Sequence, residues 1–170
     1  MEDLTDIVEI PESLKTKEPN SLRFLLCNIR GFYSKKLTLE KIVNDLDSDV
    51  ILITETHCAN ANLPVLPNFR SFVRNRETRA KGGIAILVRE SRARDCLQMW
   101  SGQGEQETLA VMFPTIEPKL VVMTNYGAQM NSFGSSVPEA NLLEIHGMIA
   151  GWLERLQGCL IPHLVTIFMN

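Results

Sequence analysis

The stretch Asp49-Val50-Ile51-Leu52-Ile53-Thr54-Glu55-Thr56-His57 decides how the rest of the chain is interpreted. It is a run of apolar, mostly β-branched residues that ends in one carboxylate. Such a run, bounded by polar residues, is typical of a strand that is covered on both faces. The strand would carry Glu55 to the rim of a sheet, where a rigidly held carboxylate could bind a metal ion. The alternative, from this stretch alone, is that Glu55 only ends the strand in solvent.

Length and composition indicate one ordinary globular domain. The chain has 170 residues, of which 45% are hydrophobic and 22% are charged, and this is enough for a real core. The net charge is -3, so only a local basic face could bind nucleic acid. The four cysteines lie far apart and form no CxxC pair. We therefore predict neither a disulfide framework nor a zinc site.

The ends of the sequence and its hydropathy predict an intracellular protein, nuclear or cytoplasmic. Met1-Glu2-Asp3 is acidic and no apolar run follows it, which argues against a secretory signal. No stretch approaches the roughly 20 apolar residues of a membrane span, so no membrane partner is expected. Residues 1–21 are polar and contain two prolines. We expect them to form a mobile leader before a domain at residues 22–170.

The residues before the quoted stretch predict a strand followed by a helix. Residues 21–27 form an apolar segment that is typical of a strand. The helix is expected from apolar residues at i, i+3, i+4 and i+7 spacing, namely Leu39, Ile42, Val43 and Leu46. Thr38 stands just before this stripe and is the expected N-cap. Together with the quoted strand, this helix makes a strand–helix–strand unit.

Later segments predict further strands and a second helix. Strands are expected at residues 70–73, 82–88, 108–113, 119–123 and 164–168. The short connection between residues 113 and 119 predicts a hairpin. Pro138 at a first helical position opens a helix to residue 157, with one apolar face against a sheet. About seven strands and two helices predict an α/β or α+β layered fold with helices outside the sheets.

Polar residues stand at the ends of three expected strands. They are Asn28, Glu55 and the pair Asn125-Tyr126. If these strands are neighbours with their ends on one side, the polar groups converge at one sheet edge. A carboxylate could then hold Mg²⁺, while an amide and a phenol could donate hydrogen bonds to phosphoryl oxygens. The alternative is that Asn28 is a turn residue and Tyr126 is packed.

Four motifs in one order carry a resemblance to a known family. They are Asn28-Ile29-Arg30-Gly31, Ile53-Thr54-Glu55-Thr56-His57, Lys81-Gly82-Gly83-Ile84-Ala85-Ile86-Leu87-Val88 and Asn125-Tyr126-Gly127. Together they resemble the endonuclease/exonuclease/phosphatase superfamily. More narrowly, the Glu-Thr-His triplet and the glycine-led strand resemble the apurinic-type endonuclease domain of non-LTR (LINE-type) retrotransposons. The resemblance covers residues 22–127 well and continues more loosely to the end.

This resemblance implies a fold and a chemistry. The fold would be a two-layer β-sandwich flanked by helices. Glu55 would be the ligand of Mg²⁺ or Mn²⁺, Asn28 would lie beside that metal or a phosphate oxygen, and Tyr126 would contact the scissile phosphate. The reaction would be in-line attack of water on a phosphodiester of DNA.

The last strand departs from the family pattern. Where the family has a Gly-Asp-x-Asn motif, this chain has Val165-Thr166-Ile167-Phe168-Met169-Asn170. Asn170 would take the place of the motif's Asn, and Phe168 would stand where the Asp belongs. The family's closing Ser-Asp-His segment has no counterpart, and His57, His146 and His163 are expected to be surface or packed residues. The resemblance therefore implies a sandwich that is incomplete at its C-terminus.

Three functions remain open from the sequence. The first is a metal-dependent DNA endonuclease domain of retrotransposon type, partial and weakly active or inactive as this chain. The second is a degenerate, non-catalytic remnant that binds nucleic acid or protein. The third is the same fold acting on a sugar phosphate, a lipid phosphate or an RNA 3′ end, against which the Glu-Thr-His triplet weighs.

Basic residues cluster around the glycine-led strand. The members are Arg70, Arg74, Arg76, Arg79, Lys81, Arg89, Arg92 and Arg94. Those nearest the expected cleft, Arg74, Arg76, Arg79 and Lys81, could contact the phosphate backbone of DNA. The alternative is a solvated loop.

Overall fold

The computed structural model describes residues 17, 21–59, 62–75, 82–101, 107–116, 119–126 and 163–169. The first sheet contains β1 (Phe24–Asn28), β2 (Val50–Thr54), β3 (Phe69–Arg74) and β4 (Ile84–Arg89), in the order β1-β2-β4-β3. The second sheet contains β5 (Leu97–Ser101), β6 (Glu107–Phe113), β7 (Leu120–Tyr126) and β8 (His163–Met169), in the order β5-β6-β7-β8. The described helices are α2 (Phe32–Asp45) and the short α3 (Glu90–Ala93).

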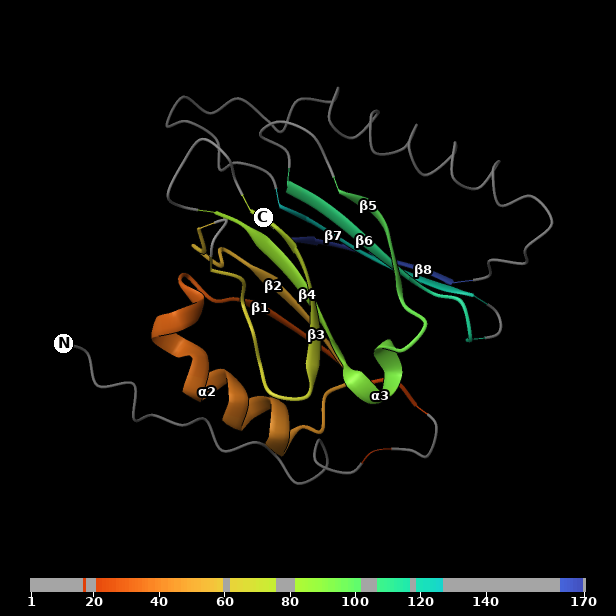
Figure 1. The fold of residues 1–170 in the computed structure, drawn as a ribbon, viewed down its shortest axis with the longest axis horizontal. Coiled ribbons are helices and arrows are strands. Elements are labelled where there is room, and N and C mark those ends of the chain that lie inside the picture. The colour runs from red at the N-terminus through yellow and green to blue at the C-terminus, as the bar shows by residue number, and fades with distance from the viewer. Residues whose placement is uncertain are drawn as a thin grey trace.

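The two sheets pack face to face, and α2 covers the outer face of the first sheet (Figure 1). Buried side chains of α2 and of that face form one apolar cluster, and a second cluster lies between the sheets. The predicted two-layer β-sandwich with an outer helix is confirmed.

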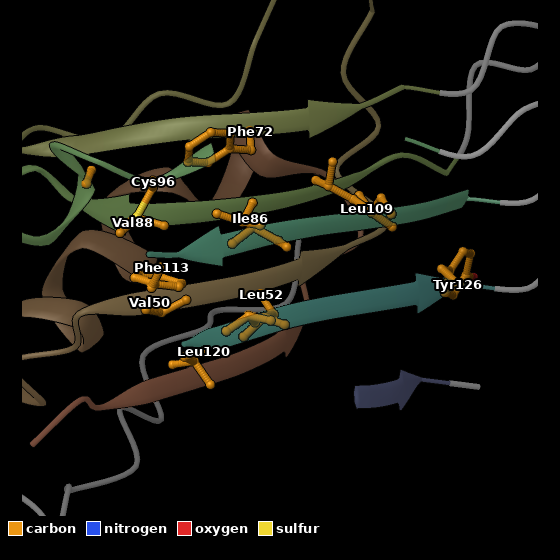
Figure 2. Close-up of a cluster of buried hydrophobic side chains, with 14 residues drawn as sticks. Val50, Leu52, Phe72, Ile86, Val88, Cys96, Leu109, Phe113, Leu120 and Tyr126 are labelled. Atoms are coloured by element: carbon orange, nitrogen blue, oxygen red, sulfur yellow. The ribbon is translucent and has the colours of Figure 1, made fainter. Parts of the chain in front are cut away.

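The strand β2 lies at the centre of this packing. Every residue of β2 is buried. Figure 2 shows Val50 and Leu52 of β2 in the cluster between the sheets, with Phe113 and Leu120 of the second sheet. The alternating residues Ile51 and Ile53 pack on the α2 side instead. The prediction of a strand covered on both faces is confirmed.

The strand–helix–strand unit is also confirmed, because β1 and β2 are parallel with α2 between them. The prediction that Thr38 caps the helix was wrong. The helix begins at Phe32 with Gly31 as its N-cap, so Thr38 lies inside it. Phe32 is fully buried, and its N–H donates to the carbonyl oxygen of Thr56 at 2.8 Å. This tertiary contact starts the helix earlier than its apolar stripe indicates.

The second sheet differs from the prediction in two places. β6 and β7 form the predicted antiparallel hairpin, but β7 continues to Tyr126 rather than ending at residue 123. Asn125 and Tyr126 therefore lie inside the strand. β5 was not predicted, since Leu97 to Ser101 contains no β-branched residue. The helix predicted from Pro138 to residue 157 lies outside the described residues.

At the end of β2 away from Glu55, buried Asp49 is surrounded by donors. The ammonium of Lys17 lies 2.7 Å from its Oδ2, which also accepts the N–H of Arg23 at 2.8 Å. Apart from residues 17 and 21, the leader predicted at residues 1–21 lies outside the described residues. Within the described part of the chain, no helix is long and apolar enough to cross a membrane.

Candidate metal and phosphate site

Three strands bring polar groups to one edge of the sandwich. Asn28 ends β1, and it is in register with Thr54, the last residue of β2. Glu55 follows Thr54, and Tyr126 ends β7 of the facing sheet. The phenol of Tyr126 donates a hydrogen bond to Oε1 of Glu55 at 2.5 Å, and the side chain of Asn28 also hydrogen-bonds Glu55. The predicted convergence is present, whereas the catalytic and ligand roles of these residues stay predictions.

The carboxylate of Glu55 is stabilised in its ionised form. The hydrogen bond from Tyr126 is the largest cause that holds the pKa of Glu55 below its ordinary value of 4.5. Partial burial opposes this, and the hydrogen bond of Asn28 and the charges of Arg30 and His57 lower the pKa further. The side chain is 14% exposed. The group is therefore ionised at neutral pH and open to a ligand.

A guanidinium and an imidazole lie beside the second oxygen of Glu55. Nε of Arg30 is 3.9 Å from Oε2, and Nε2 of His57 is 3.8 Å from the same atom. Both distances exceed that of a good hydrogen bond. Sequence reasoning left Arg30 and His57 out of the site, because their proximity depends on the turns around Glu55. Arg30 is 74% exposed, so it can also reach a bound anion.

The backbone around Glu55 has an uncommon conformation. The φ angles of Arg30, Glu55 and His57 are 47, 54 and 51°, in the left-handed region. Hydrogen bonds between backbone groups of neighbouring segments hold this conformation. The N–H of Gly31 donates to the carbonyl oxygen of Glu55 at 2.8 Å, and the N–H of Thr56 donates to the carbonyl oxygen of Gly83 at 3.0 Å. The side chain of Glu55 is thus aimed by the fold rather than by local preference.

The donor set fits a hard divalent cation. Among the described residues, no group of three or more His, Cys, Asp or Glu could hold a metal ion. One carboxylate with a neighbouring amide suits Mg²⁺, which keeps several waters and takes substrate phosphate oxygens as further ligands. It does not suit a structural zinc ion, which needs four protein ligands. Glu55 and Asn28 would hold such a cation.

The four basic residues that were predicted to contact DNA fall into two groups. Arg74 ends β3 in register with Ile84, at the same edge as Glu55. Arg76, Arg79 and Lys81 lie outside the described residues, so their DNA contact stays a prediction.

Two other arginines of the run, Arg70 and Arg89, pack within the fold. Arg70 donates to the carbonyl oxygens of Ala93 and Cys96, and Arg89 donates to that of Ser48. Their guanidinium groups lie over the rings of Phe72 and Phe69, at 4.9 and 5.0 Å. This part of the basic run is structural.

The predicted Asn170 also lies outside the described residues. β8 runs parallel to β7, and Phe168 is in register with Asn125 while Met169 is in register with Tyr126. The substitution of the family's Asp by Phe168 therefore stays a prediction.

A buried carboxylate at this edge was missed. Glu107 is 1% exposed, and its Oε2 accepts the N–H of Gly83 at 2.9 Å. It is in register with Tyr126 across the β6–β7 hairpin. The sequence does indicate that Glu107 is buried. Side chains alternate between the two faces of a strand, so Glu107 lies on the same face as the core residues Leu109 and Val111.

Comparison with known proteins agrees with this geometry. The profile of the Endonuclease/Exonuclease/phosphatase family matches residues 25–161. A 74-residue segment is 39% identical to the probable RNA-directed DNA polymerase from transposon X-element of Drosophila melanogaster, covering 42% of this chain and 8% of that protein. This relative confirms the predicted likeness to a retrotransposon protein, of which the chain spans a small part.

Solved structures show the same fold. The 3′ phosphatase NExo from Neisseria, bound to product DNA hairpin, aligns with a TM-score of 0.59 at 13% identity, over 87% of this chain and 57% of that one. An AP endonuclease from Archaeoglobus fulgidus aligns with a TM-score of 0.52 at 14% identity, over 82% of this chain and 51% of that one. With the profile match over most of its length, the chain belongs to the Endonuclease/Exonuclease/phosphatase family.

Proposed function

We propose that the chain carries part of the active site of a divalent-metal-dependent DNA endonuclease of retrotransposon type. The observation that carries the proposal is the hydrogen bond between Tyr126 and Glu55, joined by that of Asn28. These two hydrogen bonds bring an ionised carboxylate, a phenol and an amide together at one edge of the sandwich. This is the chemistry that a phosphodiester and its cation require.

Each group has a role in the proposed reaction, the attack of water on a phosphodiester. Glu55 and Asn28 would hold Mg²⁺ or Mn²⁺, which when bound offsets the negative charge that grows on the phosphoryl oxygens. Tyr126 donates its single O–H to Oε1 of Glu55 and so orients the carboxylate. It would contact the scissile phosphate only by turning that O–H away from Glu55. Arg30 and His57 lie beside Oε2 of Glu55, and the guanidinium of Arg30 would attract the phosphate backbone.

The comparisons support DNA as the substrate. The transposon relative is named as an RNA-directed DNA polymerase, and NExo is described with a product DNA hairpin. These two descriptions apply to the transposon protein and to NExo. The likeness to NExo, at 13% identity, is a likeness of fold. The retrotransposon-type Glu55-Thr56-His57 triplet extends the argument to this chain.

A second candidate is a non-catalytic remnant that binds nucleic acid. β8, the strand beside β7 and Tyr126, contains no Asp or Glu between His163 and Met169. A family Asp that orients the nucleophile would be expected on this strand. We therefore expect weak or no cleavage by the chain alone, with cation and DNA binding retained.

A nicking assay on supercoiled plasmid, with Mn²⁺ binding measured in parallel by calorimetry, tests the proposal. We expect Mn²⁺ binding that is lost in Glu55→Gln, because the neutral amide removes the charge that holds the cation. Asp95→Asn, an exposed carboxylate in the turn after α3, is the matched control and should behave as wild type.

The outcomes separate the two candidates. Nicking that requires Glu55 supports the endonuclease, and DNA binding without nicking supports the remnant. A chain that binds neither Mn²⁺ nor DNA contradicts both.

A further inference from the structure

Glu107 is a buried carboxylate that the proposed reaction does not use. It begins β6 of the second sheet, and it accepts the N–H of Gly83, which immediately precedes β4 of the first sheet. The bond therefore joins the two sheets at the edge that carries Glu55. A carboxylate with 1% exposure is costly unless its hydrogen bonds are made. Its presence here requires a physical reason.

The turn that Glu107 holds is in contact with the segment after β2. The N–H of Thr56 donates to the oxygen of Gly83 at 3.0 Å, and that of His57 donates to the oxygen of Gly82 at 2.8 Å. The turn fits closely, because a Cβ added at Gly83 would lie 2.4 Å from Oγ1 of Thr56. Any shift of this turn would therefore move the backbone that directly follows Glu55.

The side chain of Glu55 is held from the same place. Tyr126, which donates to Oε1 of Glu55, is the cross-strand neighbour of Glu107 in the register of β6 and β7. One cross-strand pair thus restrains Glu55 twice. Tyr126 holds its carboxylate directly, and Glu107 holds its backbone through the glycine turn.

We propose that Glu107 is a positioning residue of the site, which fixes the Gly82–Gly83 turn and thereby the direction in which Glu55 presents Oε2. The proposal rests on the proposed function for its chemistry, while its geometric part can be measured without any reaction. Groups that orient a metal ligand from behind typically change metal affinity or activity about 10- to 100-fold when removed.

The full chain with Glu107→Ala, Glu107→Gln and Thr108→Val tests this inference. Alanine removes the acceptor for the N–H of Gly83, whereas the amide oxygen of glutamine retains it. Thr108 is the matched control. It is the next residue of the same strand and is also buried and polar, but its side chain lies on the opposite face of the sheet. It takes part in none of the proposed contacts.

Amide hydrogen exchange by NMR is the first readout. In Glu107→Ala we expect the protection of the Thr56 and His57 amides to fall about tenfold, while Glu107→Gln and Thr108→Val keep wild-type protection. Mn²⁺ affinity should fall by a similar factor in the alanine variant and return in the glutamine variant. A purely structural role would instead lower protection throughout β6 and would not be rescued by glutamine.

Two further outcomes decide the proposal. If the alanine variant does not fold, Glu107→Gln still tests the bond, because a neutral acceptor should move the Gly83 amide proton resonance upfield. An unchanged Gly83 resonance, or unchanged exchange of Thr56 and His57 in a folded alanine variant, overturns the inference. If wild type binds no Mn²⁺, the proposed function fails while the exchange result still decides the role of Glu107.

Discussion

The two oxygens of Glu55 have different surroundings. Oε1 accepts the phenol of Tyr126 at 2.5 Å, whereas Oε2 lies 3.8–3.9 Å from His57 and Arg30. The first oxygen is therefore fixed, and the second is available for exchange with a ligand. This asymmetry gives the carboxylate a defined orientation and leaves Oε2 for the proposed cation.

Tyr126→Phe should raise the pKa of Glu55, because it removes the hydrogen bond that lowers that pKa most. A carboxylate with a lowered pKa stays ionised until the pH falls through that value. In the variant, protonation therefore begins at a higher pH, and Mn²⁺ binding should be lost at a higher pH than in wild type. A carboxyl ¹³C NMR titration of Glu55 measures the shift.

The matched control for this change is Tyr33→Phe. Tyr33 donates to the carbonyl oxygen of Leu63 at 2.7 Å and is not among the groups that shift the pKa of Glu55. Its loss should leave the titration unchanged. Equal titration curves for Tyr126→Phe and wild type would contradict the assigned hydrogen bond.

The site residues show how far a sequence can be interpreted. Glu55 and Asn28 were predictable because each stands at the end of an apolar strand within a familiar motif. Arg30, His57 and Glu107 were not predicted. Their roles depend on left-handed turns and on the contact between two sheets, neither of which any short segment encodes by itself.

At the scale of elements, β2 connects the core to the site. Its alternating residues are buried in two different clusters, one between the sheets and one beneath α2. A strand buried on both faces was predictable from the apolar run bounded by polar residues. The start of α2, the length of β7 and the existence of β5 were not, since tertiary hydrogen bonds and sheet pairing determine them.

Leu52→Ala should lower the free energy of unfolding by about 2–5 kcal/mol, because it leaves a cavity at a fully buried position of β2. Leu37→Ala on α2 is the control, since Leu37 is 80% exposed and should change stability by no more than about 0.5 kcal/mol. Urea unfolding followed by circular dichroism measures both. Similar losses for the two variants would contradict the described core.

At the scale of the whole molecule, the sandwich has two chemically different ends. One end carries Glu55, Tyr126 and Arg30, which lie in contact or close to one another. The other end, where β2 begins, carries Asp49 with Lys17 and the packed Arg89. At the first end, a phosphate backbone would meet the exposed guanidinium of Arg30 beside the proposed metal site at Glu55. At the second end, Lys17 and Arg89 are engaged in contacts within the fold.

Arg30→Ala should weaken DNA binding and lower the slope of log affinity against log salt concentration by about 1, as expected for one lost phosphate contact. Arg94→Ala removes an exposed arginine from the turn after α3 and should leave the slope unchanged. Fluorescence anisotropy with duplex DNA at several salt concentrations measures both. Equal slopes for Arg30→Ala and wild type would argue against DNA contact at this end.

The left-handed backbone at Arg30, Glu55 and His57 has a consequence for how this protein can change. Each such residue costs folding free energy of about 1 kcal/mol or more, and Gly or Asn would fit these positions better. Selection for thermal stability alone would therefore favour replacing these three residues. Retention of charged side chains there would mark pressure for binding chemistry, in a trade-off between stability and activity.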